Sequence, residues 1–206
     1  YAQFIERELG IVYSETNYFQ LHNRILEITK TLGFQDPDAL WSEAQKGISG
    51  TLRQGLLNIA TNNETSFFRD PPVYNAIQEG VIPQWIKAGK TRVRIWSAAS
   101  SFGQEAYSLS ILLAETRAKH PALDWQIIAT DIAEAALKRT SDAIYTPLEV
   151  KRGLSPERLK THFAQVDAQH WKVKPELTSK VKSQKQNLLH PFQNLGKFDL
   201  ILCRNV

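Results

Sequence analysis

The stretch Trp96-Ser97-Ala98-Ala99-Ser100-Ser101-Phe102-Gly103-Gln104-Glu105 joins an apolar segment to a segment with helical periodicity. Residues 93–96 predict a short strand before it, and residues 105–118 predict a helix after it. Further strands are predicted at 125–130 and 198–203. Strands that alternate with helices in this way are typical of a parallel sheet with crossover helices, so the sequence predicts a doubly wound α/β fold.

A ligand site is expected where the predicted strands end, because open parallel sheets bind ligands beyond the carboxyl ends of their strands. Residues 97–105 form the expected cofactor loop, but its single glycine, Gly103, disfavours a nicotinamide dinucleotide. Asp131 ends the second strand, where a carboxylate can accept hydrogen bonds from both hydroxyls of a ribose. Taken alone, Asp131 better fits the N-cap of a helix at 133–139, and the two roles are compatible. Glu105 lies in the first helical turn, where the helix dipole favours a carboxylate.

The first 90 residues predict helices. Two groups of apolar residues each share one helical face: Tyr18, Leu21, Ile25 and Ile28, and then Leu52, Leu56 and Ile59. Asp36 followed by Pro37 is a plausible helix start. Another helix is expected to begin at Asp70-Pro71-Pro72 and to stop near Pro83. We therefore predict a helical domain at 1–72 and an α/β domain at 73–206.

Two features are predicted within the second domain. Residues 171–174 and 177–182 alternate around a Pro-Glu turn, which indicates an antiparallel β-hairpin, so we place a β subdomain at about 163–182. The chain also ends directly after a predicted core strand, which would leave an open sheet edge. We therefore expect a fragment that is truncated at the C-terminus. The chain also contains no methionine, which indicates either that residue 1 is not the natural start or that some residues are not represented.

Composition narrows the class of protein. The single cysteine, Cys203, fits a reducing compartment, and no apolar run approaches the roughly 20 residues that span a bilayer. We expect a cytoplasmic protein without membrane insertion. The five histidines show no metal spacing, so no metal site is expected. Residues 151–185 carry 9 basic and 3 acidic residues, which indicates either a solvated surface or a docking site for an acidic partner. Nucleic acid is not expected, because aromatic residues do not interleave with the lysines.

Residues 62–71 read Asn-Asn-Glu-Thr-Ser-Phe-Phe-Arg-Asp-Pro. By itself the pattern of Asn63, Thr65 and Arg69 fits a capped helix end whose two phenylalanines pack in the core. Together with the 96–105 stretch, Ala-Thr-Asp-Ile at 129–132 and Phe-Asp-Leu-Ile-Leu-Cys-Arg-Asn-Val at 198–206, it resembles the CheR family of chemotaxis receptor glutamate methyltransferases. The resemblance runs from about residue 4 to the last residue.

This resemblance implies a Rossmann-like methyltransferase fold and a site for S-adenosylmethionine. The implied cofactor contacts are Asn63, Thr65, Arg69, Glu105, Asp131, Asn187, Leu188, Asn205 and Val206. In the family pattern the residue at Glu105 meets the methionyl ammonium. Arg69 is also implied in the active site, where a permanent cation can hold the carboxylate of the cofactor or of the substrate.

The implied reaction forms glutamate γ-methyl esters on the cytoplasmic helices of a chemoreceptor and releases S-adenosylhomocysteine. A glutamate side chain with a reference pKa near ~4.3 is already anionic at neutral pH, so no general base is needed. Alignment and exclusion of water are the main requirements. Two alternatives stay open: a similar methyltransferase acting on another protein or a small carboxylate, and a non-catalytic cofactor-binding interaction module.

The sequence departs from the family at two places. Residues 163–171 are short and free of glycine, whereas members that dock a receptor's C-terminal peptide tether have a longer, glycine-containing loop there. Tether binding is therefore not expected. Residues 1–70 carry 6 basic and 9 acidic residues, although the family often presents a basic face from this domain. Docking would then use a local patch such as Lys46 and Arg53, or the 151–185 region.

Overall fold

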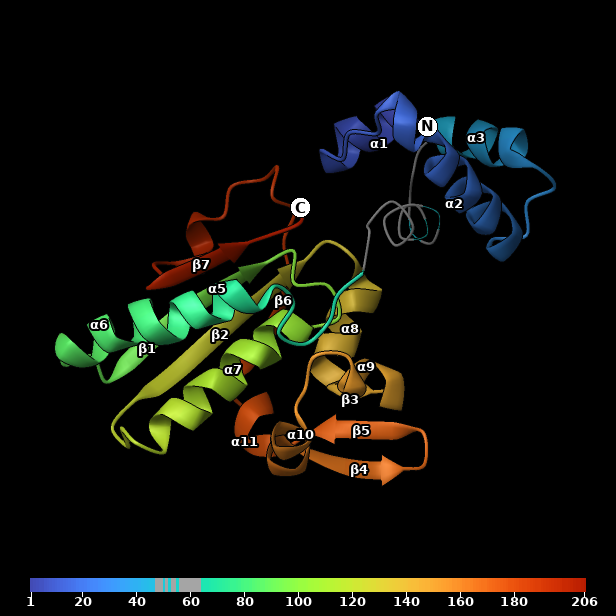
Figure 1. Ribbon diagram of the computed structural model, residues 1–206. Coiled ribbons are helices and arrows are strands. Elements are labelled where there is room, and N and C mark those ends of the chain that lie inside the picture. The colour runs from blue at the N-terminus through green and yellow to red at the C-terminus, as the bar shows by residue number, and fades with distance from the viewer. Residues whose placement is uncertain (47–49, 51, 53–54, 56–63) are drawn as a thin grey trace. The chain divides into compact units, whose positions relative to one another are not determined.

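The computed structural model describes residues 1–46, 50, 52, 55 and 64–206 (Figure 1). The chain divides into two compact units, which are described separately. The first contains Tyr1–Asn62, Ile132–Glu134 and Asn187–Pro191, and the second contains Asn63–Asp131, Ala135–Gln186 and Phe192–Val206. The main division along the chain falls at 62/63, and the domain boundary expected at 72/73 stays a prediction.

Within residues 1–46, the regular elements of the first unit are helical: α1 (Ala2–Leu9), a 3₁₀ turn (Glu15–Asn17), α2 (Tyr18–Thr31) and α3 (Pro37–Gln45). Three of the residues predicted to share a face of α2 are buried: Leu21, Ile25 and Ile28. Tyr18 remains half exposed. The predicted start of α3 is confirmed, because the Asp36 carboxylate accepts a hydrogen bond of 2.8 Å from the amide of Ala39. Leu56 and Ile59 lie outside the described residues.

The helix that begins after Asp70 continues past Pro83, so the predicted stop there is wrong. Helix α5 (Pro71–Ala76) runs into a π-helical segment (Ile77–Val81) and then into α6 (Ile82–Lys87). A proline lacks the amide that an α-helix needs, and its ring collides with a carbonyl one turn earlier. Pro83 lies in the first turn of α6, directly after the wider π segment. The change of helical pitch therefore accommodates the proline without ending the helix.

The centre of the second unit is a parallel sheet, which confirms the predicted α/β class. Its strands are β1 (Arg92–Ala98), β2 (Asp124–Asp131), β6 (Val181–Lys185) and β7 (Leu200–Cys203), in the order β6-β2-β1-β7. Helix α7 (Gln104–Arg117) connects β1 to β2 and packs against β2, β6 and α11 (Pro175–Thr178) (Figure 1). The chain passes outward from β1 through β2 to β6 and then returns to the other side of β1. Strand order therefore reverses between β1 and β7.

A smaller antiparallel sheet contains β3 (Ile144–Tyr145), β5 (His170–Val173) and β4 (Phe163–Asp167), in that order. The predicted hairpin strand at 171–174 largely matches β5, but its predicted partner at 177–182 is wrong. The partner is β4, which precedes it. Pro175 instead opens the short helix α11, and β6 pairs with β2 in the large sheet. Alternation of apolar residues shows that a segment has two faces, but it does not show which strand lies beside it.

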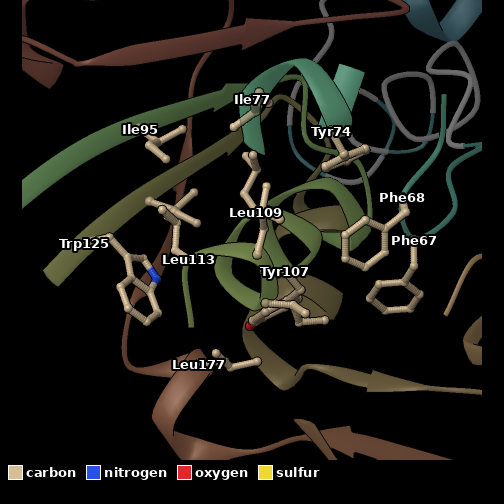
Figure 2. Close-up of a cluster of buried hydrophobic side chains, with 14 of the residues drawn as sticks. Phe67, Phe68, Tyr74, Ile77, Ile95, Tyr107, Leu109, Leu113, Trp125 and Leu177 are labelled. Carbon is tan, nitrogen blue, oxygen red and sulfur yellow. The ribbon is translucent and has the colours of Figure 1, made fainter. Parts of the chain in front are cut away.

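The second unit buries one main hydrophobic cluster, which reaches from the large sheet to the small one (Figure 2). Helix α7 contributes Tyr107, Leu109 and Leu113, which are about 1% exposed. The ring of Phe67 lies edge-on to the rings of Tyr145 and Phe163, with centroids 5.0 and 5.5 Å apart. The described residues 64–71, here called the signature segment, are therefore anchored in the core through Phe67. The small helices α8 (Glu134–Asp142), α9 (Pro147–Lys151) and α10 (Pro156–His162) complete this region.

The close approach of Gly153 to the chain at Phe67 gives a test of this packing. A Cβ on Gly153 would lie 1.8 Å from the Phe67 carbonyl oxygen, and the residue has a φ of 101°. Gly153→Ala should therefore lower the free energy of unfolding by at least about 2 kcal/mol, measured by urea denaturation. Gly80→Ala is the matched control, because a Cβ there meets nothing within 4 Å. Equal stability of the two variants would contradict the packing described here.

Candidate functional site

The site lies at the carboxyl edge of the parallel sheet. Ala98 at the end of β1 pairs with Thr130 on one side and with Cys203 on the other. Asp131 at the end of β2 pairs with Lys185 at the end of β6. The four strands thus end at one edge, and the reversal of strand order between β1 and β7 opens a position for a ligand there.

The loop between β1 and α7 has a constrained backbone. Ala99 and Ser101 both have a φ of 52°, which non-glycine residues rarely adopt, and Gly103 has a φ of 88°. The Ser100 amide donates to the Thr130 carbonyl (2.8 Å) at the end of β2. A Cβ at Gly103 would lie 2.9 Å from the Thr140 side chain. Such conformations persist only where the surrounding contacts fix them, and they are frequent at binding sites.

Asp131 holds this loop against β2. Its side chain is buried, and one carboxylate oxygen accepts a 2.9 Å hydrogen bond from the amide of Ser101. The predicted position at the end of the strand is therefore where the structure places Asp131. Its predicted contact with a ribose stays a prediction.

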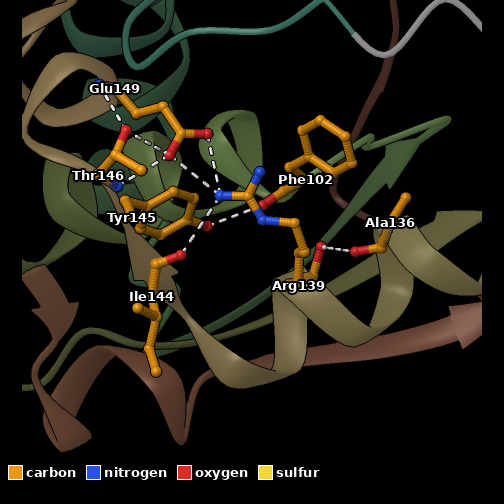
Figure 3. Close-up of polar contacts among 8 residues, drawn as sticks. Phe102, Ala136, Arg139, Ile144, Tyr145, Thr146 and Glu149 are labelled. Carbon is orange, nitrogen blue, oxygen red and sulfur yellow. Dashed lines mark hydrogen bonds and ion pairs between the residues drawn. The ribbon is translucent and has the colours of Figure 1, made fainter. Parts of the chain in front are cut away.

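A second group of contacts holds Phe102, which lies in this loop (Figure 3). Arg139 of α8 donates from one nitrogen to both carboxylate oxygens of Glu149, at 2.9 and 3.1 Å, and its guanidinium carbon lies 4.6 Å from the centre of the Phe102 ring. Tyr145 donates its hydroxyl to the Phe102 carbonyl (2.8 Å). Glu149 also completes a capping box with Thr146 at the start of α9. Both the ring and the carbonyl of Phe102 are thus held by α8, β3 and α9.

Glu105 occupies the first turn of α7, as the sequence predicts, and its side chain is 14% exposed. The Ser97 hydroxyl donates to one carboxylate oxygen (2.7 Å), and Arg204 donates to the other (3.1 Å). Burial raises the pKa of the Glu105 carboxyl, while the Ser97 hydrogen bond and the Arg204 charge oppose that rise. The Glu105 carboxylate is thus fixed at the start of α7, and its predicted contact with an ammonium group stays a prediction.

Arg204 is the site residue that the sequence analysis missed. It follows β7 and has three polar contacts: it donates to Glu105, donates to the Arg69 carbonyl (3.0 Å), and forms an ion pair with Asp70. Its side chain is 17% exposed. An arginine placed directly after an apolar strand at the reversal of strand order is a signal that could have identified it. Arg204 joins the end of β7 to α7 and to the signature segment.

The signature segment is partly in the core and partly at this edge. Phe67 and Phe68 are buried, which confirms their predicted packing. Arg69 donates to the Glu64 carbonyl (2.7 Å), so its guanidinium closes the turn that begins at Glu64. Thr65 is partly buried within that turn, and Asn63 lies outside the described residues.

The other predicted contacts follow β6 and β7. Asn205 has a φ of 55°, and Val206 beside it is exposed. Asn187 and Leu188 belong to the first unit, where the Asn187 side chain accepts a hydrogen bond of 2.9 Å from the amide of Leu189. Among the predicted site residues, Glu105 and the main-chain carbonyl of Arg69 are joined in one network, because Arg204 donates to both.

Two buried polar side-chain atoms at the loop between β1 and α7 lack a partner in the part of the chain that the structure describes. The Ser100 hydroxyl and the Gln104 side-chain oxygen have no hydrogen-bond partner among the described residues, although both side chains are almost fully buried. Buried polar atoms are nearly always paired, so these two are candidates for ligand contacts.

Within the described part of the chain, no group of three or more His, Cys, Asp or Glu residues could hold a metal ion. No helix formed by the described residues is long and apolar enough to cross a membrane.

The raised pKa of Glu105 predicts how stability depends on pH. Between the ordinary pKa of 4.5 and the raised value, the folded state keeps a proton that the unfolded state has released. The free energy of unfolding should therefore fall as pH rises through that window, and Glu105→Gln should remove this contribution. Urea denaturation between about pH 4 and about pH 8 measures it, with exposed Glu79→Gln as the control for loss of a charge. A wild-type to Glu105→Gln difference that stays constant with pH would contradict the prediction.

Comparison with known proteins adds independent information. Residues 63–206 match the family described as CheR methyltransferase, SAM binding domain. The chain is 37% identical to chemotaxis protein methyltransferase 1 of Pseudomonas aeruginosa, over 98% of this chain and 75% of that protein. It is 34% identical to chemotaxis protein methyltransferase Cher2 of Pseudomonas putida, with the same coverage. It is 33% identical to a chemotaxis protein methyltransferase of Vibrio parahaemolyticus, over 100% of this chain and 75% of that protein.

Proposed function

Because the chain belongs to the CheR methyltransferase family, whose domain binds S-adenosylmethionine, we propose that it methylates glutamate side chains on the cytoplasmic helices of a chemoreceptor. The methyl donor is S-adenosylmethionine, and the protein is a methyltransferase of chemotaxis. The products would be a glutamate γ-methyl ester and S-adenosylhomocysteine. The protein would act in the cytoplasm.

The observation that best supports this proposal is the network centred on Arg204. It places the Glu105 carboxylate, the Arg69 turn and the ends of β1 and β7 in one group of contacts. A methyl transfer to a carboxylate needs an anionic acceptor, held in line with the donor and shielded from water. The permanent cation of Arg69 suits the orientation of an acceptor carboxylate.

Glu105 and Asp131 have proposed roles at the carboxyl edge of the sheet. When bound, S-adenosylmethionine supplies an activated methyl group on a sulfonium. Glu105 would receive its ammonium group, and Asp131 would accept hydrogen bonds from the ribose while holding Ser101. The remaining proposed contacts are Asn63, Thr65, Asn187, Leu188, Asn205 and Val206.

The decisive experiment is transfer of a radiolabelled methyl group from S-adenosylmethionine to receptor-rich membranes. A base-labile product on the receptor is the expected result, because methyl esters of glutamate hydrolyse readily in base. Transfer to a different protein or to a small carboxylate would instead identify a related methyltransferase. Cofactor binding without any transfer would identify an interaction module.

Arg69 should affect turnover more than folding. Arg69→Ala should lower kcat by about 10- to 100-fold, because the acceptor would lose the cation that orients it. Arg69→Lys should recover only part, since a point charge does not reproduce the planar guanidinium that reaches the Glu64 carbonyl. Arg117→Ala is the matched control for loss of an arginine, because Arg117 lies in the last turn of α7, at the opposite end from Glu105. Full methyl transfer by both Arg69 variants would leave Arg69 with a structural role alone.

The basic region 151–185 predicts how the acceptor docks. Several of its lysines are exposed, among them Lys151, Lys160, Lys172 and Lys182. If they attract an acidic receptor helix, apparent receptor affinity should weaken as added salt shortens the Debye length below ~8–10 Å, while cofactor affinity changes little. Salt-independent receptor affinity would argue against this surface.

A receptor tether is a separate question. Residues 163–171 form β4, a short turn and the start of β5, without the glycine-containing loop of tether-binding relatives. A free peptide copied from a receptor C-terminus should therefore compete weakly for docking. Tight and saturable binding of that peptide in calorimetry would show that the short turn is sufficient.

A further inference from the structure

The turn formed by residues 67–70, here called the signature turn, has an unusual backbone. Phe68 has a φ of 50° and Asp70 a φ of 59°. Residues with side chains rarely adopt this region, and such a turn persists only where surrounding contacts fix it. Whatever holds Phe68 therefore also fixes the position from which the Arg69 side chain projects.

The guanidinium of Arg158 lies against the ring of Phe68, with its central carbon 4.0 Å from the ring centroid. Arg158 belongs to α10 and forms a two-point hydrogen bond with Glu115 of α7 (Nε to Oε1 2.8 Å, Nη2 to Oε2 2.9 Å). Its own amide donates to the Ser155 hydroxyl (3.2 Å) at the start of α10. The planar guanidinium is thus fixed in both position and orientation.

Helix α7 also holds the backbone of Phe68. The Phe68 amide donates to the Ser108 hydroxyl (2.9 Å), which in turn donates to the Gln104 carbonyl (2.6 Å). Helix α7 therefore holds Phe68 at two points. Ser108 binds its amide, and Glu115 holds the Arg158 guanidinium that lies against its ring. The same helix carries Glu105, which binds Arg204, and Arg204 binds the carbonyl of Arg69. Groups on α7, or bound to α7, thus hold the signature turn at the amide and ring of Phe68 and at the carbonyl of Arg69.

We propose that Arg158, held by Glu115, is a positioning residue for methyl transfer: it fixes the ring of Phe68 and thereby the turn that carries Arg69. The inference rests on the proposed function of Arg69. Arg158 acts through Phe68, so its loss should affect turnover while leaving cofactor affinity nearly unchanged.

Substitutions at the ion pair separate positioning from simple stabilisation. Arg158→Met should lower kcat by about tenfold and change the cofactor Kd by less than about threefold, and Arg158→Lys should recover only part of the loss. The double variant Arg158→Glu with Glu115→Arg should restore the ion pair and the Tm. It should not restore turnover, because a carboxylate then faces the electron-rich face of the Phe68 ring. Recovery of stability and turnover together would overturn the proposal.

A double-mutant cycle tests the route through Phe68. Phe68→Leu keeps an apolar side chain but removes the aromatic face. In that background Arg158→Met should change kcat by no more than about twofold. An undiminished tenfold loss would show that Arg158 does not act through this ring. Lys138→Gln, which breaks an exposed ion pair with Asp142, is the control and should leave kcat unchanged.

Amide hydrogen exchange provides a readout that needs no acceptor. In Arg158→Met, amides of residues 64–70 should exchange faster than in the wild-type protein, while those of residues 97–103 should not change. Unchanged exchange at 64–70 would overturn the role of Arg158. A wild-type protein that fails to methylate receptor glutamates would instead overturn the proposed function alone, so the two failures are distinguishable.

Discussion

The candidate site depends on the hydrogen bonds and ion pairs of the Arg204 guanidinium. The guanidinium contacts a carboxylate at the start of α7, a carbonyl in the signature turn and the carboxylate of Asp70. An arginine suits this position because its planar group has five donors and stays charged at any physiological pH. Loss of its charge would leave the largely buried Glu105 without its cationic partner. A buried carboxylate without a partner lowers the free energy of unfolding. The contact thereby ties the last strand to two segments that lie far before it in the chain.

Strained backbone is concentrated at the same edge of the sheet. Ala99, Ser101, Phe68, Asp70 and Asn205 all have positive φ values. Each such residue costs free energy, of the order of ~1–3 kcal/mol, that the rest of the fold has to offset. Here the offset comes from contacts with rigid elements, such as the bond from Ser101 to Asp131 and the bond from Phe68 to Ser108. A site built in this way is held in place before any ligand arrives.

Two similar devices support the two loops of the site. Arg139 pairs with Glu149 and lies over Phe102, while Arg158 pairs with Glu115 and lies over Phe68. In each case a carboxylate fixes the orientation of a guanidinium, and the guanidinium covers one face of an aromatic ring. A salt bridge at this level of exposure contributes little stability on its own. Its value here lies in the geometry that it imposes on a loop.

The sequence by itself determined the class of fold, the family, the cofactor and several local features. Helix caps such as Asp36 depend on neighbouring residues, and the strand at 125–130 is visible as a short apolar run bounded by polar residues. The sequence also placed Glu105 in the first turn of a helix and Asp131 at the end of a strand, because the ends of strands and the starts of helices depend on nearby residues. Motif order along the chain identified the family without any knowledge of contacts.

Only the tertiary structure decided which distant segments meet. Arg204 was missed because its partners Glu105 and Asp70 lie 99 and 134 positions away along the chain. The segment that forms β6 was assigned to the hairpin, but it pairs with β2 in the large sheet. The alternation of apolar residues within a strand does not show which strand lies beside it. Pro83 did not end its helix because a π segment, fixed by packing in the core, changes the pitch before it. Local propensity specifies elements, whereas pairing between elements depends on burial and charge contacts that close only in the folded chain.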